Sequence, residues 1–377
     1  MQRGHQIGKC AVVSVFFFLL LLPGLQMVTG FPRVPLLDEN RNRERPPDLS
    51  EITKPIALLS QAQKWFADHY GYRDWLIRAK TQIDYSVFGV SDKVYTGNEG
   101  WLYHRNIMDN EEPAEEAMTD QQLDELIAQF VLLRDFLKSH GIRLIVVTNE
   151  MKDRFYPEYL PRAARLRLPR HRFEDFKGKL RQVGEIIYID STKILEPLKS
   201  TRRIFHKTDL HWNDPAAAAV AQTLVDTVAG LEGREVPFWR YPLNLKILEM
   251  SGGEARFLPL FYPPTEQALA IDPNPAEGSY QFVSPERPFF KEIIRKTGQN
   301  NETLPAVMLY GDSFMDGMLR AGLLGRFDTT YRMQLPMRDV WGQLPSDVRY
   351  FIYQFIEIRL PSGLVTELEL PARAEWQ

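Results

Sequence analysis

Residues 119–148, TDQQLDELIAQFVLLRDFLKSHGIRLIVVT, predict a helix followed at once by a strand. Thr119 and Gln122 form a T-x-x-Q capping box at the helix start. Leucine, isoleucine and phenylalanine then recur at helical spacing as far as Leu137, and Gly141 supplies a stop signal. The β-branched run that follows, Ile142–Thr148, is typical of a strand buried on both faces.

The same order of elements recurs on the C-terminal side. A polar helix at residues 172–183 precedes a strand at 185–190, and a strand at 306–310 leads through a Gly-Asp-Ser corner into a helix ending near residue 324. A last strand is expected at 349–358. Helices alternating with strands predict an α/β fold, with a mostly parallel sheet flanked by helices.

Other segments complete the predicted organisation. Residues 55–85 have the spacing of one or two helices, and residues 94–103 read as a strand or a hairpin turn. We expect a helix at 216–229, with Asp214 as its N-cap. Residues 232–303 are rich in proline, glycine and aromatic side chains and predict a long loop-rich insertion. The sequence therefore divides into an N-terminal segment (1–30), a charged linker (31–54) and one catalytic-type domain (55–377).

Composition excludes several classes of protein. The chain has 377 residues, of which 44% are hydrophobic and 25% charged, with a net charge of −3. This is globular composition with enough length for a buried core, and the near-neutral charge argues against nucleic acid as a partner. Cys10 is the single cysteine, so no intrachain disulfide and no cysteine-rich zinc site can form.

The N-terminus predicts export. Arg3 and Lys9 precede an apolar run, Ala11–Leu22, which Pro23 and Gly24 interrupt. This is the pattern of a signal peptide, and continuing the run to residue 28 would give a short membrane anchor. Removal after residue 30 and retention as an anchor both stay open. A buried N-terminal helix is disfavoured because the run has no polar face.

Two motifs carry candidate chemistry. Ser313 follows a predicted strand and begins a helix, at the sheet edge where α/β proteins bind ligands, and the N–H groups there could stabilise an oxyanion. A serine nucleophile needs a base and an orienting carboxylate. Asp209 and His211 could supply both if their segment is extended, because side chains two apart then face the same side.

Other interpretations of these motifs remain. The Gly-Asp-Ser corner can be a plain tight turn, and an aspartate near a helix start is commonly structural. His206, Asp209 and His211 could also hold zinc or iron, although no further ligand cluster stands out, and we expect no metal and no cofactor.

Taken together, the motifs resemble a known family. Gly311-Asp312-Ser313-Phe314, preceded in the chain by Thr208-Asp209-x-His211-Trp212-Asn213, is similar to the SGNH-hydrolase-like alginate O-acetyltransferases of the AlgJ and AlgX type. Shorter stretches agree with that family: Asp38–Arg41, Phe66–Asp74, Gly97–Tyr103, Lys152 and Tyr156–Pro161. The resemblance spans most of residues 38–360.

The resemblance implies a periplasmic O-acetyltransferase with Ser313 as nucleophile, His211 as base and Asp209 as orienting carboxylate. Acetyl groups would pass through an acetyl-serine to hydroxyls of an exopolysaccharide, alginate or another. A membrane-bound O-acyltransferase would relay the acetyl group within a polysaccharide biosynthesis and secretion complex. An acetylesterase with the same triad and a non-catalytic scaffold are the alternatives. The polymer, the acetyl donor and the oligomeric state are not determined by the sequence.

Further residues are candidates for substrate or oxyanion binding. Gly311, Asn213 and Trp212 lie in the two motifs, and Asn213 is equally a helix cap. Lys152 and Arg154 follow the strand that ends at Thr148, where they could hold carboxylates of an acidic polymer or be solvated. Backbone N–H groups of Gly252 and Gly253 could serve the oxyanion, or belong to a plain turn. Trp101, Tyr103 and Trp212 could stack on sugars or pack in the core.

Overall fold

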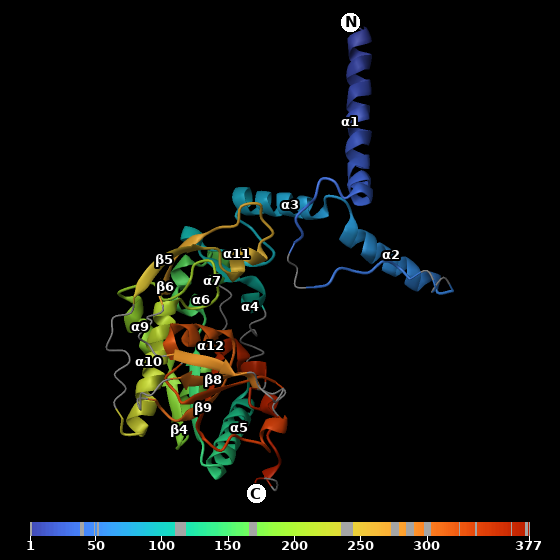
Figure 1. Cartoon of the computed structure of the whole chain (residues 1–377). Coiled ribbons are helices and arrows are strands. Elements are labelled where there is room, and N and C mark those ends of the chain that lie inside the picture. The colour runs from blue at the N-terminus through green and yellow to red at the C-terminus, as the bar shows by residue number, and fades with distance from the viewer. Residues whose placement is uncertain are drawn as a thin grey trace. The chain divides into compact units, whose positions relative to one another are not determined.

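The computed structural model describes residues 2–37, 41–48, 50, 53–109, 118–165, 172–234, 244–272, 279–283, 290–297, 303–323, 325–335, 338–362, 364–373 and 376 (Figure 1). The chain divides into two compact units. The first comprises residues 1–93 and 255–263, and the second comprises residues 94–254 and 264–377. Residues 55–93, expected within the catalytic-type domain, thus group with the N-terminal segment.

Among the described residues of 1–93, the first unit contains the helices α1 (Gln2–Thr29), α2 (Pro55–His69) and α3 (Arg73–Phe88). Within α1, residues Val12–Thr29 have a mean hydropathy of 2.2 and are long and apolar enough to cross a membrane, a test that signal sequences also pass. The segment between α1 and α2 forms ion pairs with α2 and α3. Arg41 binds the buried Asp68 at 2.6 Å, and Arg43 binds the buried Asp74 at 2.5 Å.

A seven-stranded sheet forms the centre of the second unit, in the order β4-β3-β11-β9-β10-β8-β7. Neighbours from β4 to β10 are parallel, whereas β8 and β7 are antiparallel. The strands are β3 (Arg143–Asn149), β4 (Ile186–Asp190), β7 (Ser279–Val283), β8 (Phe290–Thr297), β9 (Ala306–Gly311), β10 (Thr329–Met333) and β11 (Val348–Ile356). The predicted, mostly parallel sheet is confirmed.

Helices cover both faces of this sheet. One core contains side chains of α9 (Ser191–Lys199), α10 (Asp214–Leu231) and α12 (Ser313–Met318), and the other contains those of α5 (Asp120–Ser139) and α8 (Phe173–Arg181). Along β3, Ile145 and Val147 join the first core, while Leu144 and Val146 join the second. This alternation follows from the two-residue period of a strand, and Figure 1 shows α10 and α5 on opposite sides of the strands.

Local signals explain where the main helices begin. Thr119 and Gln122 form the predicted capping box: the Thr119 hydroxyl accepts the Gln122 N–H, and the Gln122 side chain accepts the Thr119 N–H. The predicted N-cap of α10 was wrong by one residue. Asn213 holds that position, with its Oδ1 accepting the Ala216 N–H at 3.1 Å, and Asp214 is the first helical residue.

The region expected to be a loop-rich insertion is more regular than predicted. It contains an antiparallel pair, β5 (Leu245–Met250) and β6 (Glu266–Ile271), together with α11 (Gly253–Phe257) and both antiparallel strands of the main sheet. The predicted hairpin near residue 100 is β1 (Val94–Thr96) paired with β2 (Leu102–His104). Shorter helices are α4 (Arg105–Asp109), α6 (Lys152–Phe155) and α7 (Arg162–Arg165), and single turns lie at Asn98–Gly100, Pro157–Tyr159, Leu319–Leu323, Arg338–Val340, Glu357–Ser362 and Thr366–Leu368.

Candidate active site

Ser313 lies at the carboxyl edge of the parallel sheet, where β9 ends and α12 begins. The preceding Asp312 caps α12, because its Oδ1 accepts the Phe314 N–H at 3.0 Å. The same carboxylate accepts the Gln354 side-chain N–H at 2.9 Å and the Ile356 N–H at 2.8 Å. Asp312 therefore fixes the corner to the end of β11, while the Ser313 side chain stays exposed.

Gly311 allows β9 and β11 to approach each other closely at this corner. A Cβ atom on residue 311 would lie 2.5 Å from Oε1 of the buried Gln354, a distance at which atoms must move apart. Close packing therefore explains why residue 311 is a glycine, whether or not it also has the predicted substrate-binding role.

His211 and Asp209 complete a chain of hydrogen bonds that starts at Ser313. The His211 Nε2 is 2.7 Å from the Ser313 Oγ, and the His211 Nδ1 is 2.6 Å from the Asp209 Oδ1. The His211 and Asp209 side chains are 28% and 13% exposed, so solvent reaches the imidazole more than the carboxylate. Such an arrangement of hydroxyl, imidazole and carboxylate can carry out proton transfer and nucleophilic attack.

Asp209 and His211 meet through a turn and not through the extended segment that we expected. An antiparallel bridge between Phe205 and Trp212 closes a tight loop, and the His206 N–H donates to the His211 carbonyl at 3.2 Å. Inside this loop the Asp209 Oδ1 also accepts the backbone N–H of His211 at 3.0 Å. This Asx-type turn brings the carboxylate to the ring nitrogen of the residue two positions later.

The surroundings of Asp209 favour its ionised form. Burial raises the pKa of this carboxyl, but the hydrogen bond and charge of His211 and the backbone N–H of Gly253 outweigh burial and leave the pKa well below its usual range. The Gly253 N–H donates to the Asp209 Oδ2 at 2.6 Å. Asp209 is therefore a carboxylate at neutral pH, able to stabilise an imidazolium beside it.

Gly252 and Gly253 support Asp209 and do not point to an oxyanion. The Gly252 N–H donates to the Thr208 Oγ1 at 3.0 Å, and the Gly253 N–H is used by Asp209. Glu266, the first residue of β6, accepts both the N–H and the hydroxyl of Thr208, at 2.7 and 2.8 Å. Sequence reasoning missed Glu266 because no motif links it to a threonine 58 positions away.

The two predicted cationic residues differ in exposure, since Lys152 is buried and the Arg154 side chain is 21% exposed. Lys152 is 1% exposed, and its Nζ donates to the Asp209 carbonyl at 2.7 Å. The Arg154 Nε lies 3.4 Å from the Glu357 Oε2, and Glu357 in turn accepts the Met151 N–H at 2.8 Å. Both cations therefore serve internal contacts, and a carboxylate of the polymer would have to displace buried partners to reach Lys152.

The remaining candidates are packed inside the second unit. Asn213 uses both side-chain atoms, with Oδ1 capping α10 and Nδ2 donating to the Arg203 carbonyl at 2.6 Å. Trp212 is 1% exposed and packs edge-on against Phe314, with ring centroids 5.2 Å apart. Trp101 and Tyr103 are equally buried. These side chains form the core behind the site, as one of the two interpretations of the sequence had it, and offer no exposed ring for sugar stacking.

The metal alternative lacks a ligand group. Over the described ranges, no cluster of three histidine, cysteine, aspartate or glutamate side chains is arranged to hold a metal ion. His206 lies in the same loop as Asp209 and His211 but is buried, and burial lowers the pKa of its imidazole.

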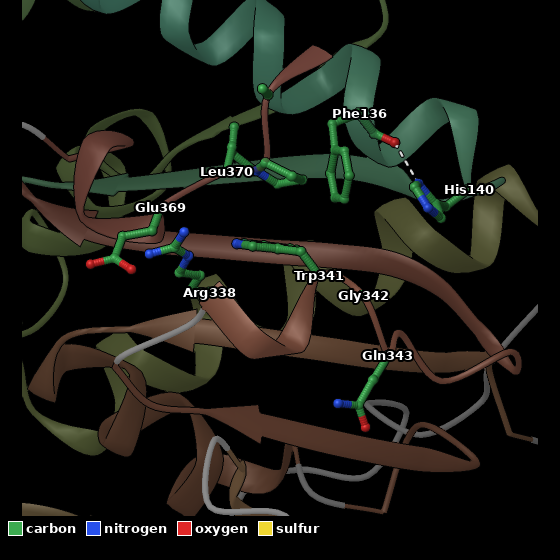
Figure 2. Close-up of a pocket in the computed structure, with 10 residues that line it drawn as sticks. Phe136, His140, Arg338, Trp341, Gly342, Gln343, Glu369 and Leu370 are labelled. Carbon is green, nitrogen blue, oxygen red and sulfur yellow. Dashed lines mark hydrogen bonds between the residues drawn. The ribbon is translucent and has the colours of Figure 1, made fainter. Parts of the chain in front are cut away.

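A cavity of about 850 Å³ lies elsewhere in the second unit (Figure 2). Its lining comes from the end of α5, from the turn before β11 and from residues 369–372, with Phe136, Arg338, Trp341 and Glu369 among the side chains. These segments adjoin the amino ends of β3 and β11, the opposite edge of the sheet from Ser313. The cavity therefore does not belong to the hydrogen-bonded chain of Ser313, His211 and Asp209.

Part of the chain is similar to known acetyltransferases. Residues 94–260 match the family model described as SGNH hydrolase-like domain, acetyltransferase AlgX. The chain is 30% identical over 146 residues to the probable alginate O-acetylase AlgJ of Pseudomonas aeruginosa, covering 38% of this chain and 35% of that protein. It is 26% identical over 281 residues to AlgJ of Pseudomonas syringae pv. tomato, covering 73% of this chain and 63% of that protein. The chain thus spans less than two thirds of these relatives.

Solved structures were found to be similar as well. PatB1 of Bacillus cereus superposes with a TM-score of 0.51 and 14% sequence identity, covering 72% of this chain and 97% of that one. The O-acetyltransferase domain of Pseudomonas putida AlgJ gives a TM-score of 0.45 at 19% identity, over 71% of this chain and 92% of that domain. The match to PatB1 and the family model confirm the predicted α/β fold of the SGNH-hydrolase-like type.

Proposed function

We propose that this chain, which is similar to the AlgJ/AlgX-type acetyltransferases, is an O-acetyltransferase that works through Ser313, His211 and Asp209. One observation carries the proposal. The Ser313 Oγ, the two ring nitrogens of His211 and the Asp209 carboxylate form a continuous chain of hydrogen bonds of 2.7 and 2.6 Å, with the hydroxyl exposed to substrate.

The reaction has two halves. In the first, His211 Nε2 accepts the proton of Ser313 while Oγ attacks the acetyl carbonyl of the donor, and the imidazolium then gives that proton to the leaving group. In the second, His211 takes the proton of an acceptor hydroxyl, whose oxygen attacks the acetyl-serine. The imidazolium then returns the proton to the Ser313 Oγ as the bond between that oxygen and the acetyl group breaks. The ionised Asp209 stabilises the imidazolium in both halves. The Ser313 N–H, in the first turn of α12 where no helical carbonyl can accept it, is a candidate oxyanion donor.

The names of the relatives guide the choice of acceptor and partners. AlgJ is named a probable alginate O-acetylase, so we infer that the acceptor is a hydroxyl of an exopolysaccharide, alginate or another. An apolar N-terminal helix fits export to the periplasm, either as a signal peptide or as an inner-membrane anchor. A membrane-bound O-acyltransferase in the same polysaccharide complex would then supply the acetyl group.

Hydrolysis is the second candidate function. Ser313 is exposed, so water can reach an acetyl-serine unless bound polysaccharide excludes it. The chain would then be a carbohydrate acetylesterase with the same triad. The third candidate, a non-catalytic scaffold, requires no reaction at Ser313.

Acetylation of the serine tests the proposal directly. Purified full-length protein is incubated with p-nitrophenyl acetate, with and without oligosaccharide, and analysed by mass spectrometry. We expect an acetyl group on the Ser313 peptide and acetylated sugar when oligosaccharide is present. Ser313→Ala should abolish both, a loss of several orders of magnitude in rate. Ser200→Ala, at an exposed serine whose hydroxyl donates to the Pro197 carbonyl, should leave both unchanged.

The other outcomes separate the alternatives. Free acetate in an amount that added sugar does not change, without acetylated sugar, indicates an esterase. If Ser313→Ala supports full polymer acetylation in cells from which the native gene has been deleted, the chain is a scaffold.

A further inference from the structure

Lys152 is a buried cation whose ammonium group contacts the loop that carries Asp209 and His211. It is the first residue of α6, just beyond the carboxyl end of β3, and is 1% exposed. Its Nζ lies 2.7 Å from the Asp209 carbonyl oxygen, 3.3 Å from that of Lys207 and 3.4 Å from that of His206. An ammonium has three donors, so one lysine can serve all three carbonyls of a tight turn.

We propose that Lys152 is a positioning residue that holds the Asp209–His211 loop in register with Ser313. This inference rests on the proposed function, because positioning has a consequence only if the three residues react. Lys152 does not contact Ser313 or His211 through its ammonium, so it acts through the loop and not on the substrate.

The loop needs a cation at this point. Three carbonyl oxygens that converge on one position repel each other in a buried environment, where electrostatic interactions are much stronger than in water. The ammonium turns this repulsion into attraction. With an apolar side chain instead, the carbonyls would turn apart to find other donors, and the Asp209 carboxylate would move with its own backbone.

The charges around Lys152 fit the same role. The acidic groups that face it are Glu254, Asp209, Glu266 and Asp153. Burial lowers the pKa of Lys152, and these four groups oppose the decrease. Its ring contact is the Tyr103 face, with Nζ 5.3 Å from the centroid. The cation is thus surrounded by acidic groups and an aromatic face, and Asp209 is the acidic residue whose own carbonyl it holds.

Lys177 provides a matched control. It is also 1% exposed and also lies beside the sheet, in α8, but its Nζ contacts the carboxylates of Glu150 and Glu174, each at 2.5 Å. Loss of either buried ammonium should destabilise the fold. Of these two losses, only that of Lys152 should alter the reaction.

The test compares Lys152→Met and Lys152→Arg with Lys177→Met and Lys177→Arg in the full chain. Acylation by p-nitrophenyl acetate is followed across pH, below the unfolding temperature of each variant.

We expect Lys152→Met to lower kcat by about 100-fold, the cost of a displacement near 1 Å, with little change in KM. In the native protein the nearby cation disfavours the protonated, inactive form of the triad. Its loss in Lys152→Met should therefore move the acidic limb of the pH–rate profile to higher pH. Lys152→Arg should keep the limb in place but not restore the full rate, since a planar guanidinium cannot serve three carbonyls that converge on one point.

Each outcome has a distinct meaning. A folded Lys152→Met protein with native rate and native pH profile overturns the inference and leaves the proposed function intact. If Lys152→Met does not fold, Lys152→Arg decides: a native rate overturns the inference, and a reduced rate beside an unaffected Lys177→Arg supports it. If the native protein itself does not acylate Ser313, the proposed function fails, and the positioning inference fails with it.

Discussion

Asp209 and Asp312 are two carboxylates of the site, and their surroundings move their pKa values in opposite directions. Burial raises the pKa of Asp312, and its bonds from Gln354 and two backbone N–H groups only partly oppose this. At Asp209, burial is outweighed by the imidazole of His211 and the Gly253 N–H. The difference matches their surroundings, since Asp312 fixes a corner through neutral donors, whereas Asp209 faces an imidazole ring that becomes charged in the proposed reaction.

At the residue scale, Glu254 should make stability depend on pH. It is fully buried, and burial raises its pKa from an ordinary 4.5 to about 7, with Lys152 opposing and Asp209 adding to the increase. Between these two pH values the unfolded chain has released the proton and the folded chain has kept it. The free energy of unfolding therefore falls from pH 4.5 to 7, by roughly 3 kcal/mol for this group, and is flat above.

Urea unfolding of Glu254→Gln across pH 4.5 to 8 measures this contribution. The native protein should lose roughly 3 kcal/mol more than the variant over that range, and Glu196→Gln, at an exposed position of α9, should follow the native curve. Parallel curves for the native protein and Glu254→Gln would show that the pKa of the Glu254 carboxyl in the folded protein is not raised.

At the scale of elements, the turn that begins α11 should be intolerant of side chains. A Cβ atom on residue 252 would lie 2.3 Å from the Thr208 carbonyl oxygen and 2.6 Å from the Asp209 Cβ. Gly252→Ala must therefore push the turn away from Asp209 and weaken the bond from Gly253. We expect a loss of about 1 to 3 kcal/mol in unfolding free energy and a decrease of at least tenfold in Ser313 acylation.

Gly230→Ala is the control for this change. Residue 230 lies near the end of α10 with open space around its Cβ position, so alanine should stabilise the helix by about 0.5 to 1 kcal/mol without affecting acylation. A Gly252→Ala protein with native stability and native rate would show that the turn is not tightly packed against Asp209.

Asn213 tests whether a residue of the motif serves the helix or the substrate. Asn213→Ala removes the cap of α10 and the bond to the Arg203 carbonyl. It should cost about 1 to 2 kcal/mol, seen as a lower Tm, with acylation by the folded protein changed less than threefold. Asn213→Ser, which can still cap α10 without setting an acceptor against the Arg203 carbonyl, should recover part of the stability. A large loss of rate without loss of stability would instead assign Asn213 to the reaction.

These elements also show where sequence reasoning succeeds. The order of α5 and β3 was predictable because a capping box, helical spacing and a β-branched run agree over 30 consecutive residues. Strands β7 and β8 were not, because SYQFV mixes polar and apolar residues, and FKEIIRKT charged and apolar ones, without a clear alternation. Their positions depend on antiparallel pairing, of β7 with β8 and of β8 with β10.

The site divides in the same way. Ser313, His211 and Asp209 could be proposed from two short motifs, and the structure brings them within hydrogen-bond distance. Nothing near Lys152 in the sequence signals that a lysine is buried beneath a loop more than 50 positions away. The contacts of Gly253 with Asp209 and of Glu266 with Thr208 are equally non-local, since they depend on how the insertion packs and not on any spacing.

At the scale of the whole molecule, the N-terminal helix should decide where the reaction takes place. Residues 12–29 form an 18-residue apolar stretch, about 27 Å long at 1.5 Å per residue, close to the roughly 30 Å of bilayer hydrocarbon. If this helix is retained, the full chain should stay in the membrane fraction after an alkaline carbonate wash.

A chain starting at Phe31 behind a cleavable secretion signal should be released in soluble form and should acylate Ser313 at the native rate, because the triad lies wholly in the second unit. N-terminal sequencing of the native protein is the deciding measurement: a mature chain beginning at Phe31 would show that the helix is a signal peptide and that membrane attachment, if observed, comes from partners.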